Sequence, residues 1–216
     1  MRKVRIFCLL AQVAALNMFC AYCQAADTIQ GNPAYAEQQY QLALSLYKQN
    51  KSDESLSILE DLYRTRPEVI RYLYDYVAIA SWSGKHELAV SDKTLNLEIA
   101  PAYVLEAVAS SQRELQDYDA SIKAYDFVIQ RFPERTDAQL DRANTLIDAQ
   151  RYQEAEAGLS SLRKQFPRRV DVMESVIRWS DGGKSPINTL TETEKLLEID
   201  PGNSFALKMR YHALKK

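Results

Sequence analysis

The chain has 216 residues, which is enough for one domain with a sizeable core or for a repeat array of similar mass. Hydrophobic residues make up 46% of it and charged residues 26%, a composition that excludes the disordered and the membrane-embedded classes. Only 6 glycines and 7 prolines occur, so a loop-rich β-sandwich is disfavoured and an all-helical fold is favoured.

The first 25 residues have the three-part layout of a secretory signal peptide. Residues 1–5 carry three basic charges, the stretch that follows is almost wholly apolar, and the small residues Cys23 and Ala25 occupy the −3 and −1 positions. This pattern predicts cleavage before Ala26 and export of the remaining chain. The alternative is an uncleaved N-terminal anchor, because the apolar character continues to about Cys23.

All three cysteines lie in this segment, so the exported protein would contain none. It would enter an oxidising compartment without a disulfide to form, a thiolate metal ligand or a cysteine nucleophile. Removal of the segment leaves 24 basic against 29 acidic residues, a net charge of −5 in place of −2, which argues against a nucleic-acid partner. No later apolar run approaches the length of a membrane-spanning helix.

After a predicted linker at residues 26–33, prolines recur at a nearly constant interval. The members of the series are Pro67, Pro101, Pro133, Pro167 and Pro201. Their spacings are 34, 32, 34 and 34 residues, and each follows an apolar-periodic segment. Proline cannot continue a helix but suits the first turn of the next one. An interval of 34 residues is typical of a helix–turn–helix repeat.

The interval divides residues 34–216 into five helical hairpins and one further helix. We expect the hairpins at residues 34–67, 68–101, 102–133, 134–167 and 168–201, and the further helix at residues 203–214. The fifth hairpin departs most from the pattern, with Thr189 and Thr193 at positions that are usually small or aromatic. Its predicted helices are Val172–Trp179 and Pro186–Ile199. The last helix is either the first helix of a sixth copy or a solvating cap.

Small residues recur where the helices of such hairpins cross. They are Ala43, Val77, Ala109 and Ala143 in the first helices, and Ser55, Ala89, Ser121 and Ala155 in the second helices. An apolar residue follows in the second helix of three copies, whereas the second copy has Lys93. Short polar turns separate the helices, and Gly84 in one of them suits a left-handed cap.

These features resemble the tetratricopeptide repeat family over nearly all of residues 34–216. The resemblance implies an all-α fold, an α-solenoid of about five tetratricopeptide-like hairpins wound into a right-handed superhelix. One such hairpin cannot bury its apolar face alone, so successive copies stack and share a continuous core. Most aliphatic residues are accounted for by this stacking.

Groups suited to catalysis or metal binding are sparse. His86 and His212 lie far apart in the array, without cysteine or carboxylate neighbours at ligand spacing. Asp117, Asp119 and Asp126 form an acidic cluster, but the first two belong to a turn, where aspartate caps a helix N-terminus. The sequence therefore predicts no enzyme, no metal site and no cofactor.

The candidate binding surface is the concave face, formed by the sides of the first helices that point away from the core. Its candidate residues are Tyr40, Tyr47, Tyr74, Asp75, Trp82, Tyr103, Glu106, Arg113, Asp141, Asn144 and Asp148, with Gln41, Arg71, Glu174 and Arg178 beside them. Aromatic faces next to carboxylates suit sugar rings that carry free amines. The alternative is an ordinary solvated face with half-buried tyrosines.

Two segments resemble a narrower family, the periplasmic repeat region of the outer-membrane porin that exports poly-β-1,6-N-acetylglucosamine. They are VIRYLYDYVAIASWSGKHELAV at residues 69–90 and IAPAYVLEAVASSQRELQDYDASIKAYDFVIQRFP at residues 99–133. This resemblance implies a periplasmic protein, either free or associated with the outer membrane, with a role in exopolysaccharide export and biofilm formation. The implied partners are a polysaccharide deacetylase and the partly deacetylated, cationic polymer.

The resemblance does not extend to the membrane pore domain of that family, because no run of alternating strands follows Pro201. It therefore implies a fragment, a truncated paralogue or a separate repeat subunit. The alternative function is a general periplasmic adaptor that binds a protein partner in envelope biogenesis or cell division.

Overall fold

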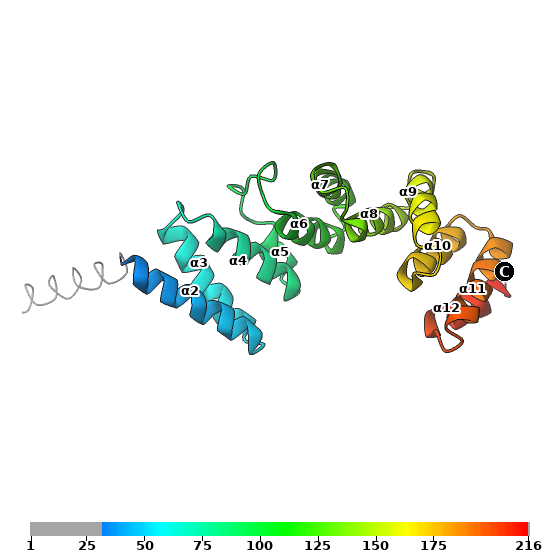
Figure 1. Cartoon of the computed structure of the whole chain (residues 1–216), viewed down its shortest axis with the longest axis horizontal. Helices are drawn as coiled ribbons and strands as arrows, with labels where there is room; N and C mark the ends of the chain where they lie inside the picture. Colours follow the sequence, from blue (N-terminus) through cyan, green and yellow to red (C-terminus); the bar gives the residue numbers. More distant parts are fainter. Residues whose placement is uncertain (1–31, 216) are drawn as a thin grey trace, which may run out of the picture. The chain divides into compact units, whose positions relative to one another are not determined.

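The computed structural model describes residues 32–215, so the predicted signal peptide and nearly all of the predicted linker lie outside the described residues. Within residues 32–215 every regular element is an α-helix (Figure 1). The helices are α2 (Pro33–Lys48), α3 (Ser52–Thr65), α4 (Arg71–Trp82), α5 (His86–Ala89), α6 (Ala102–Glu114), α7 (Tyr118–Arg131), α8 (Thr136–Asp148), α9 (Tyr152–Gln165), α10 (Val170–Gly182), α11 (Pro186–Ile199) and α12 (Ser204–Ala213). The prediction of an all-α array of helical hairpins is confirmed.

The chain divides into two compact units, residues 1–73 and residues 74–216. The first unit contains the hairpin of α2 and α3. Asn32 caps α2 by accepting a hydrogen bond from the Ala34 amide at 2.9 Å, and Pro33 occupies the first turn, where its missing N–H costs nothing. Ala43 and Leu59 are fully buried between the two helices.

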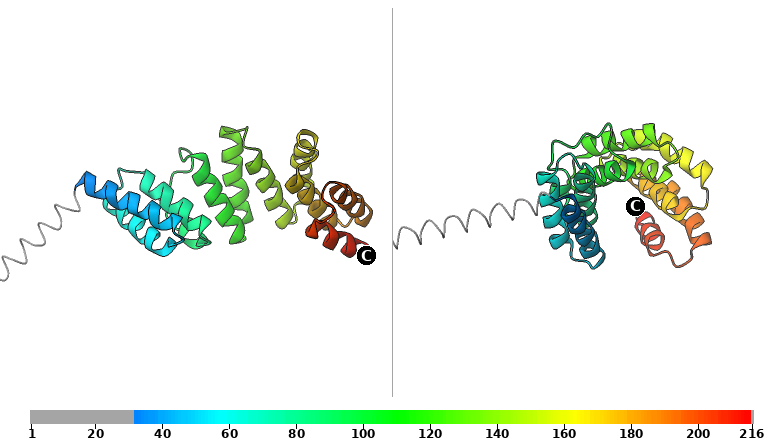
Figure 2. Two further views of the ribbon diagram at one scale, coloured as in Figure 1. Left: turned by 60° about the horizontal axis from the view of Figure 1, so that its bottom comes forward. Right: turned by 60° about the vertical axis from the view of Figure 1, so that its left-hand side comes forward.

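The second unit stacks the hairpins α6–α7, α8–α9 and α10–α11, followed by α12. Each first helix contacts the next, α6 with α8, α8 with α10, and α10 with α12. Within this unit α10 and α12 lie on the inside of the curve, whereas α9 and α11 lie on the outside (Figure 2). The sides of the first helices that face this inside form one continuous surface, which we call the inner face.

The predicted crossing positions are buried in both units. The four small residues of the first helices are at most 2% exposed, and so are the four of the second helices. Around α8 and α9 the core is built by Leu140, Leu146, Leu159, Leu162 and Val172. Aligning the copies on their prolines therefore identifies core positions. It does so because helices that cross closely need small side chains at fixed positions of each copy.

Five turns close the hairpins with one residue in the left-handed region. These residues are Asn50, Gly84, Gln116, Gln150 and Lys184, with φ between 59° and 73°. The prediction for Gly84 is confirmed, and the other four turns hold a non-glycine residue in the same conformation.

The second helix of the second copy is the main difference from the predicted pattern. The sequence predicts a helix through LAVSDKTLNLEIAP, but α5 ends at Ala89 and an irregular segment continues to Pro101. Asp92 accepts hydrogen bonds from the Thr94 amide and hydroxyl, and Asn96 accepts one from the Glu98 amide. Such local side-chain bonds compete with helical ones, and Lys93 offers no apolar group to a core.

The fifth copy forms both predicted helices despite its unusual threonines. Thr189 and Thr193 are fully buried. The Thr189 hydroxyl donates to the Ser185 carbonyl at 3.0 Å and lies 3.2 Å from the Ser180 hydroxyl, and Thr193 donates to the Leu190 carbonyl at 2.8 Å. Satisfied hydroxyls therefore replace the apolar groups usual at these positions.

Candidate functional site

Two of the predicted binding residues lie in the first unit, and one of them is buried. Tyr40 is only 9% exposed, and its ring lies 5.2 Å from that of Tyr72. The Arg71 guanidinium lies over the Tyr40 ring and pairs with Glu37. The prediction that Tyr40 lines an open groove is therefore wrong, because the ring serves packing, whereas Tyr47 remains half-buried.

The other nine predicted residues lie in the second unit, where an aromatic group occupies the start of the inner face. The Tyr103 hydroxyl on α6 donates to the Asp75 carboxylate on α4 at 2.9 Å. The Trp82 ring lies 6.4 Å from the Tyr103 ring and is 58% exposed, while Tyr74 is half-buried. The hydrogen bond fixes Tyr103 and thereby orients one side of an exposed aromatic surface.

An arginine pair occupies the middle of the inner face. Arg113 on α6 donates to Asp148 on α8 at 2.7 Å, and Arg178 on α10 donates to the other oxygen of the same carboxylate. Arg178 also donates to the Asn144 oxygen at 3.3 Å. Three consecutive first helices are thus joined by one shared carboxylate, with charge-assisted hydrogen bonds that are stronger than neutral ones.

The residue two positions after the repeat proline makes a further set of contacts along this face. Arg135, the N-cap of α8, donates to Glu106 at 2.8 Å, and Asn203, the N-cap of α12, donates to Glu174 at 3.0 Å. Arg169, the N-cap of α10, pairs with Asp137 and Asp171. Sequence reasoning missed these three side chains, although their common position after the proline was the signal that could have found them.

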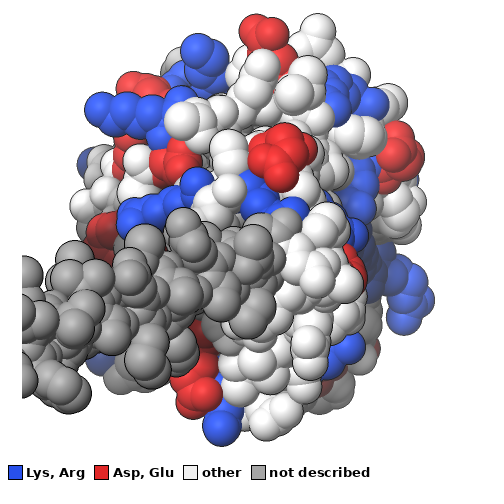
Figure 3. Space-filling model, turned by 90° about the vertical axis from the view of Figure 1, so that its left-hand side faces the viewer, with Lys and Arg blue, Asp and Glu red and all other residues white. Residues whose placement is uncertain are grey.

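These contacts change the predicted character of the face. The sequence predicts an acidic groove, whereas Glu106 and Asp148 are each engaged by arginine. Basic and acidic side chains are also interspersed on a different surface of the molecule, the one that faces the viewer in Figure 3. The inner face of the second unit is therefore mainly a network of internal charge pairs.

Asp141 on α8 is the exception among the predicted acids. Its carboxylate is half-buried and receives no hydrogen bond from residues 32–215. Burial raises its pKa, the charge of Arg113 opposes this, and Asp137, Glu106 and Asp171 raise the pKa further. The neighbouring Tyr125 on α7 is buried, and burial together with the charge of Asp141 raises the pKa of its phenol.

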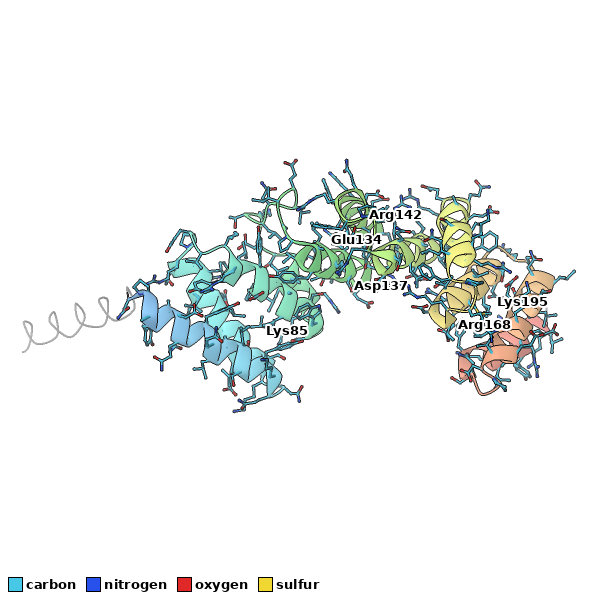
Figure 4. All side chains as sticks on the ribbon, in the orientation of Figure 1. Lys85, Glu134, Asp137, Arg142, Arg168 and Lys195 are labelled. Atoms are coloured by element: carbon cyan, nitrogen blue, oxygen red, sulfur yellow. The ribbon has the colours of Figure 1, made fainter. Side chains whose placement is uncertain are left out.

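An open pocket of about 310 Å³ lies between α9, α10 and α11. Its lining combines apolar residues such as Met173 and Val176 with the cations Arg163, Arg168 and Lys195 (the last two labelled in Figure 4). Glu192 pairs with both Arg163 and Lys195, so two of these three cations are engaged within the protein. The pocket is a weaker candidate than the inner face for this reason.

Two further features of the described residues bear on the class of site. Within residues 32–215, no group of three or more histidine, cysteine, aspartate or glutamate side chains is placed to hold a metal ion. None of the helices in that range combines the length and the apolar character that spanning a membrane requires.

Two segments of the chain match models of a known family. Residues 39–68 and residues 112–172 each match a tetratricopeptide repeat model. These segments are similar to tetratricopeptide repeats. They cover the first hairpin and the middle of the second unit, including Arg113, Asp141 and Asp148, so these three residues lie on a tetratricopeptide framework.

Solved tetratricopeptide structures have the same fold. A tetratricopeptide repeat protein from Parabacteroides merdae aligns with a TM-score of 0.69 and 18% identity, over 84% of this chain and 74% of that one. YrrB, described as having an unusual peptide-binding site, aligns with a TM-score of 0.67 and 15% identity, over 88% of this chain and 97% of that one. PilF of Pseudomonas aeruginosa aligns with a TM-score of 0.62 and 14% identity, over 92% of this chain and 96% of that one. No curated protein sequence matches the chain.

Proposed function

We propose that the protein is a non-enzymatic scaffold that binds an extended segment of a partner protein along the inner face of its second unit. The observation that carries the proposal is Trp82, which is 58% exposed beside a tyrosine held in place by Asp75. Tryptophan and tyrosine dominate the binding energy of protein interfaces. The peptide-binding site described for YrrB, whose fold is similar, supports an extended peptide as the ligand.

The test is selection of a display library of random peptides on the whole chain, followed by titration of a selected peptide against variants. Trp82→Ala and Asp75→Ala should each weaken binding by about tenfold or more while leaving the helical content unchanged. Ile187→Ala is the matched control, because this α11 side chain is 78% exposed and lies on a second helix. Unchanged affinity in both inner-face variants would refute the assignment.

A second candidate is a role in the export of partly deacetylated poly-N-acetylglucosamine, with a polysaccharide deacetylase as the protein partner. It rests on the sequence resemblance of residues 69–90 and 99–133 and on Trp82 and Tyr103, because aromatic rings suit sugar faces. The arginine partners of Glu106 and Asp148 weigh against it, since they leave fewer carboxylates for a cationic polymer.

Titration with partly deacetylated glucosamine oligomers and with the deacetylase tests this second candidate. No binding at millimolar oligomer and micromolar deacetylase would remove it and leave the general adaptor in envelope biogenesis or cell division. Neighbouring genes for a polysaccharide synthase and a deacetylase would favour export, whereas neighbouring division genes would favour the adaptor.

We propose that the protein acts in the periplasm, on the basis of the signal-peptide pattern of its first 25 residues. N-terminal sequencing of the protein recovered from a periplasmic fraction should start at Ala26. Recovery of the intact N-terminus in the cytoplasmic fraction would contradict this localisation.

A further inference from the structure

The three polar residues that α8 presents to the inner face differ in what they contact. Asp141, Asn144 and Asp148 are spaced by three and four residues, so they share one side of the helix. Asn144 accepts a hydrogen bond from Arg178, and Asp148 accepts from both Arg113 and Arg178. Asp141 receives none from residues 32–215, so one position of this row is left with its acceptor capacity unused.

The geometry explains why the protein does not pair Asp141 itself. Arg113 is the cation that acts on this carboxylate, but its Nε and its Nη2 both bond to the same oxygen of Asp148, at 2.7 and 2.6 Å. The other charged groups that act on Asp141 are acidic: Glu106 on α6, Asp171 on α10 and Asp137 on α8 itself. Glu106 pairs with Arg135, and Asp137 and Asp171 share Arg169.

A half-buried carboxylate without a hydrogen-bonded partner lowers the stability of the folded chain. Burial disfavours the charged form of a carboxylate, and no hydrogen bond from residues 32–215 offsets this at Asp141. A donor from outside the chain that carries a positive charge recovers this cost, because it supplies both the hydrogen bond and the missing charge. A single carboxylate does not suffice for a metal ion, which takes several oxygen ligands.

We propose that Asp141 is the specificity-determining residue of the inner face and that it accepts a hydrogen bond from a lysine or arginine side chain of the bound peptide. The inference rests on the proposed function, since it names the chemistry of the peptide that the inner face recognises. The arginine pair on Asp148 repels a second cation nearby, so one basic residue is recognised at one position.

The test uses the random-peptide selection on the whole chain, run in parallel on the wild type, Asp141→Asn and Asp119→Asn. Asp119 is the matched control, because the substitution and the charge change are identical and its side chain is 92% exposed at the start of α7. Peptides selected by the wild type and by the control should share a lysine or arginine at one fixed position. Peptides selected by Asp141→Asn should lack this preference.

Titration of one selected peptide then gives the magnitude. Its affinity should fall by about tenfold or more on Asp141→Asn and by less than about twofold on Asp119→Asn. Replacing the basic residue of the peptide by norleucine should cause a similar loss with the wild type and little further loss with Asp141→Asn. This second change leaves the protein intact, so it tests the contact even where a protein variant folds poorly.

The outcomes separate the two proposals. Selected peptides without a fixed basic residue, or equal affinity for the wild type and Asp141→Asn, would overturn the role of Asp141 and leave peptide binding standing. A selection that enriches no peptide on the wild type would overturn the proposed function and this inference with it.

Discussion

The turns that close the hairpins allow a test of backbone strain with changes of opposite sign. Gly84 and Gln150 occupy the same position of two turns, with φ of 73° and 59°. A side chain in this left-handed region brings its Cβ close to the following carbonyl oxygen, which costs about 1–2 kcal/mol. We therefore expect Gly84→Ala to lower the free energy of unfolding and Gln150→Gly to raise it.

The structure sets the magnitude of both changes. A Cβ added at Gly84 meets no atom within 4 Å, so the cost of Gly84→Ala is that of the backbone alone. Alanine also restricts the unfolded chain, which offsets about 0.4–1 kcal/mol, so the net loss is about 1 kcal/mol. The reverse reasoning gives a gain of about 0.5–1 kcal/mol for Gln150→Gly.

Urea unfolding followed by far-ultraviolet circular dichroism measures these differences, provided that the slope with denaturant is unchanged. Gly158→Ala is the control, because Gly158 lies inside α9 and an added Cβ there also meets no atom within 4 Å. In a helix interior the same substitution should stabilise by about 1 kcal/mol. If Gly84→Ala and Gly158→Ala change stability in the same direction, the argument from φ fails.

Three further substitutions test the packing and the charges. Leu59→Ala should lower the free energy of unfolding by about 2–5 kcal/mol in urea titrations, because Leu59 is fully buried. Asp148→Ala should cost about 2 kcal/mol by the same measurement, since it removes the shared acceptor of two arginines, whereas Asp119→Ala should cost less than about 1 kcal/mol. Asp141→Asn should stabilise the protein at neutral pH. Because folding raises the Asp141 pKa, the wild type loses stability as the pH rises from the unfolded-state pKa, about 4, through the higher folded-state pKa. The gain should therefore vanish below about pH 4, and a gain that persists in acid would contradict this.

The sequence predicts most of the helices because the proline interval and the small crossing residues are properties of each copy alone. The segment after Ala89 is the exception, since three local features oppose the helix there: the Asp92 and Asn96 side-chain bonds and Lys93 at a core position. Asparagine and aspartate at such spacing favour turns. The predicted helix follows instead from the apolar residues around them, which have a helical period.

The candidate site could be predicted only in part, because its charges are paired between copies. Helical spacing assigns Glu106 and Asp148 correctly to the first helices, but it does not reveal that Arg135 and Arg178 reach them from 29 and 30 residues away. The separations are close to the repeat interval because the contacts join equivalent faces of neighbouring copies. A prediction made for each helix separately therefore counts carboxylates as unpaired that are paired with arginines of another copy, and it overestimates the negative charge of the inner face.

This pairing also determines which residues remain for a ligand. In a stack of repeats, each polar side chain on the inner face can bond to the next copy, and every such bond both joins the copies and removes a group from the binding surface. Asp148 is used in this way twice, whereas Asp141, two turns earlier on the same helix, is not used. The ligand preference of such an array is then set by the charged groups that the neighbouring copies do not hydrogen-bond and by the apolar area that they leave exposed. On the inner face Asp141 supplies the charge, and the exposed ring of Trp82 supplies the apolar area.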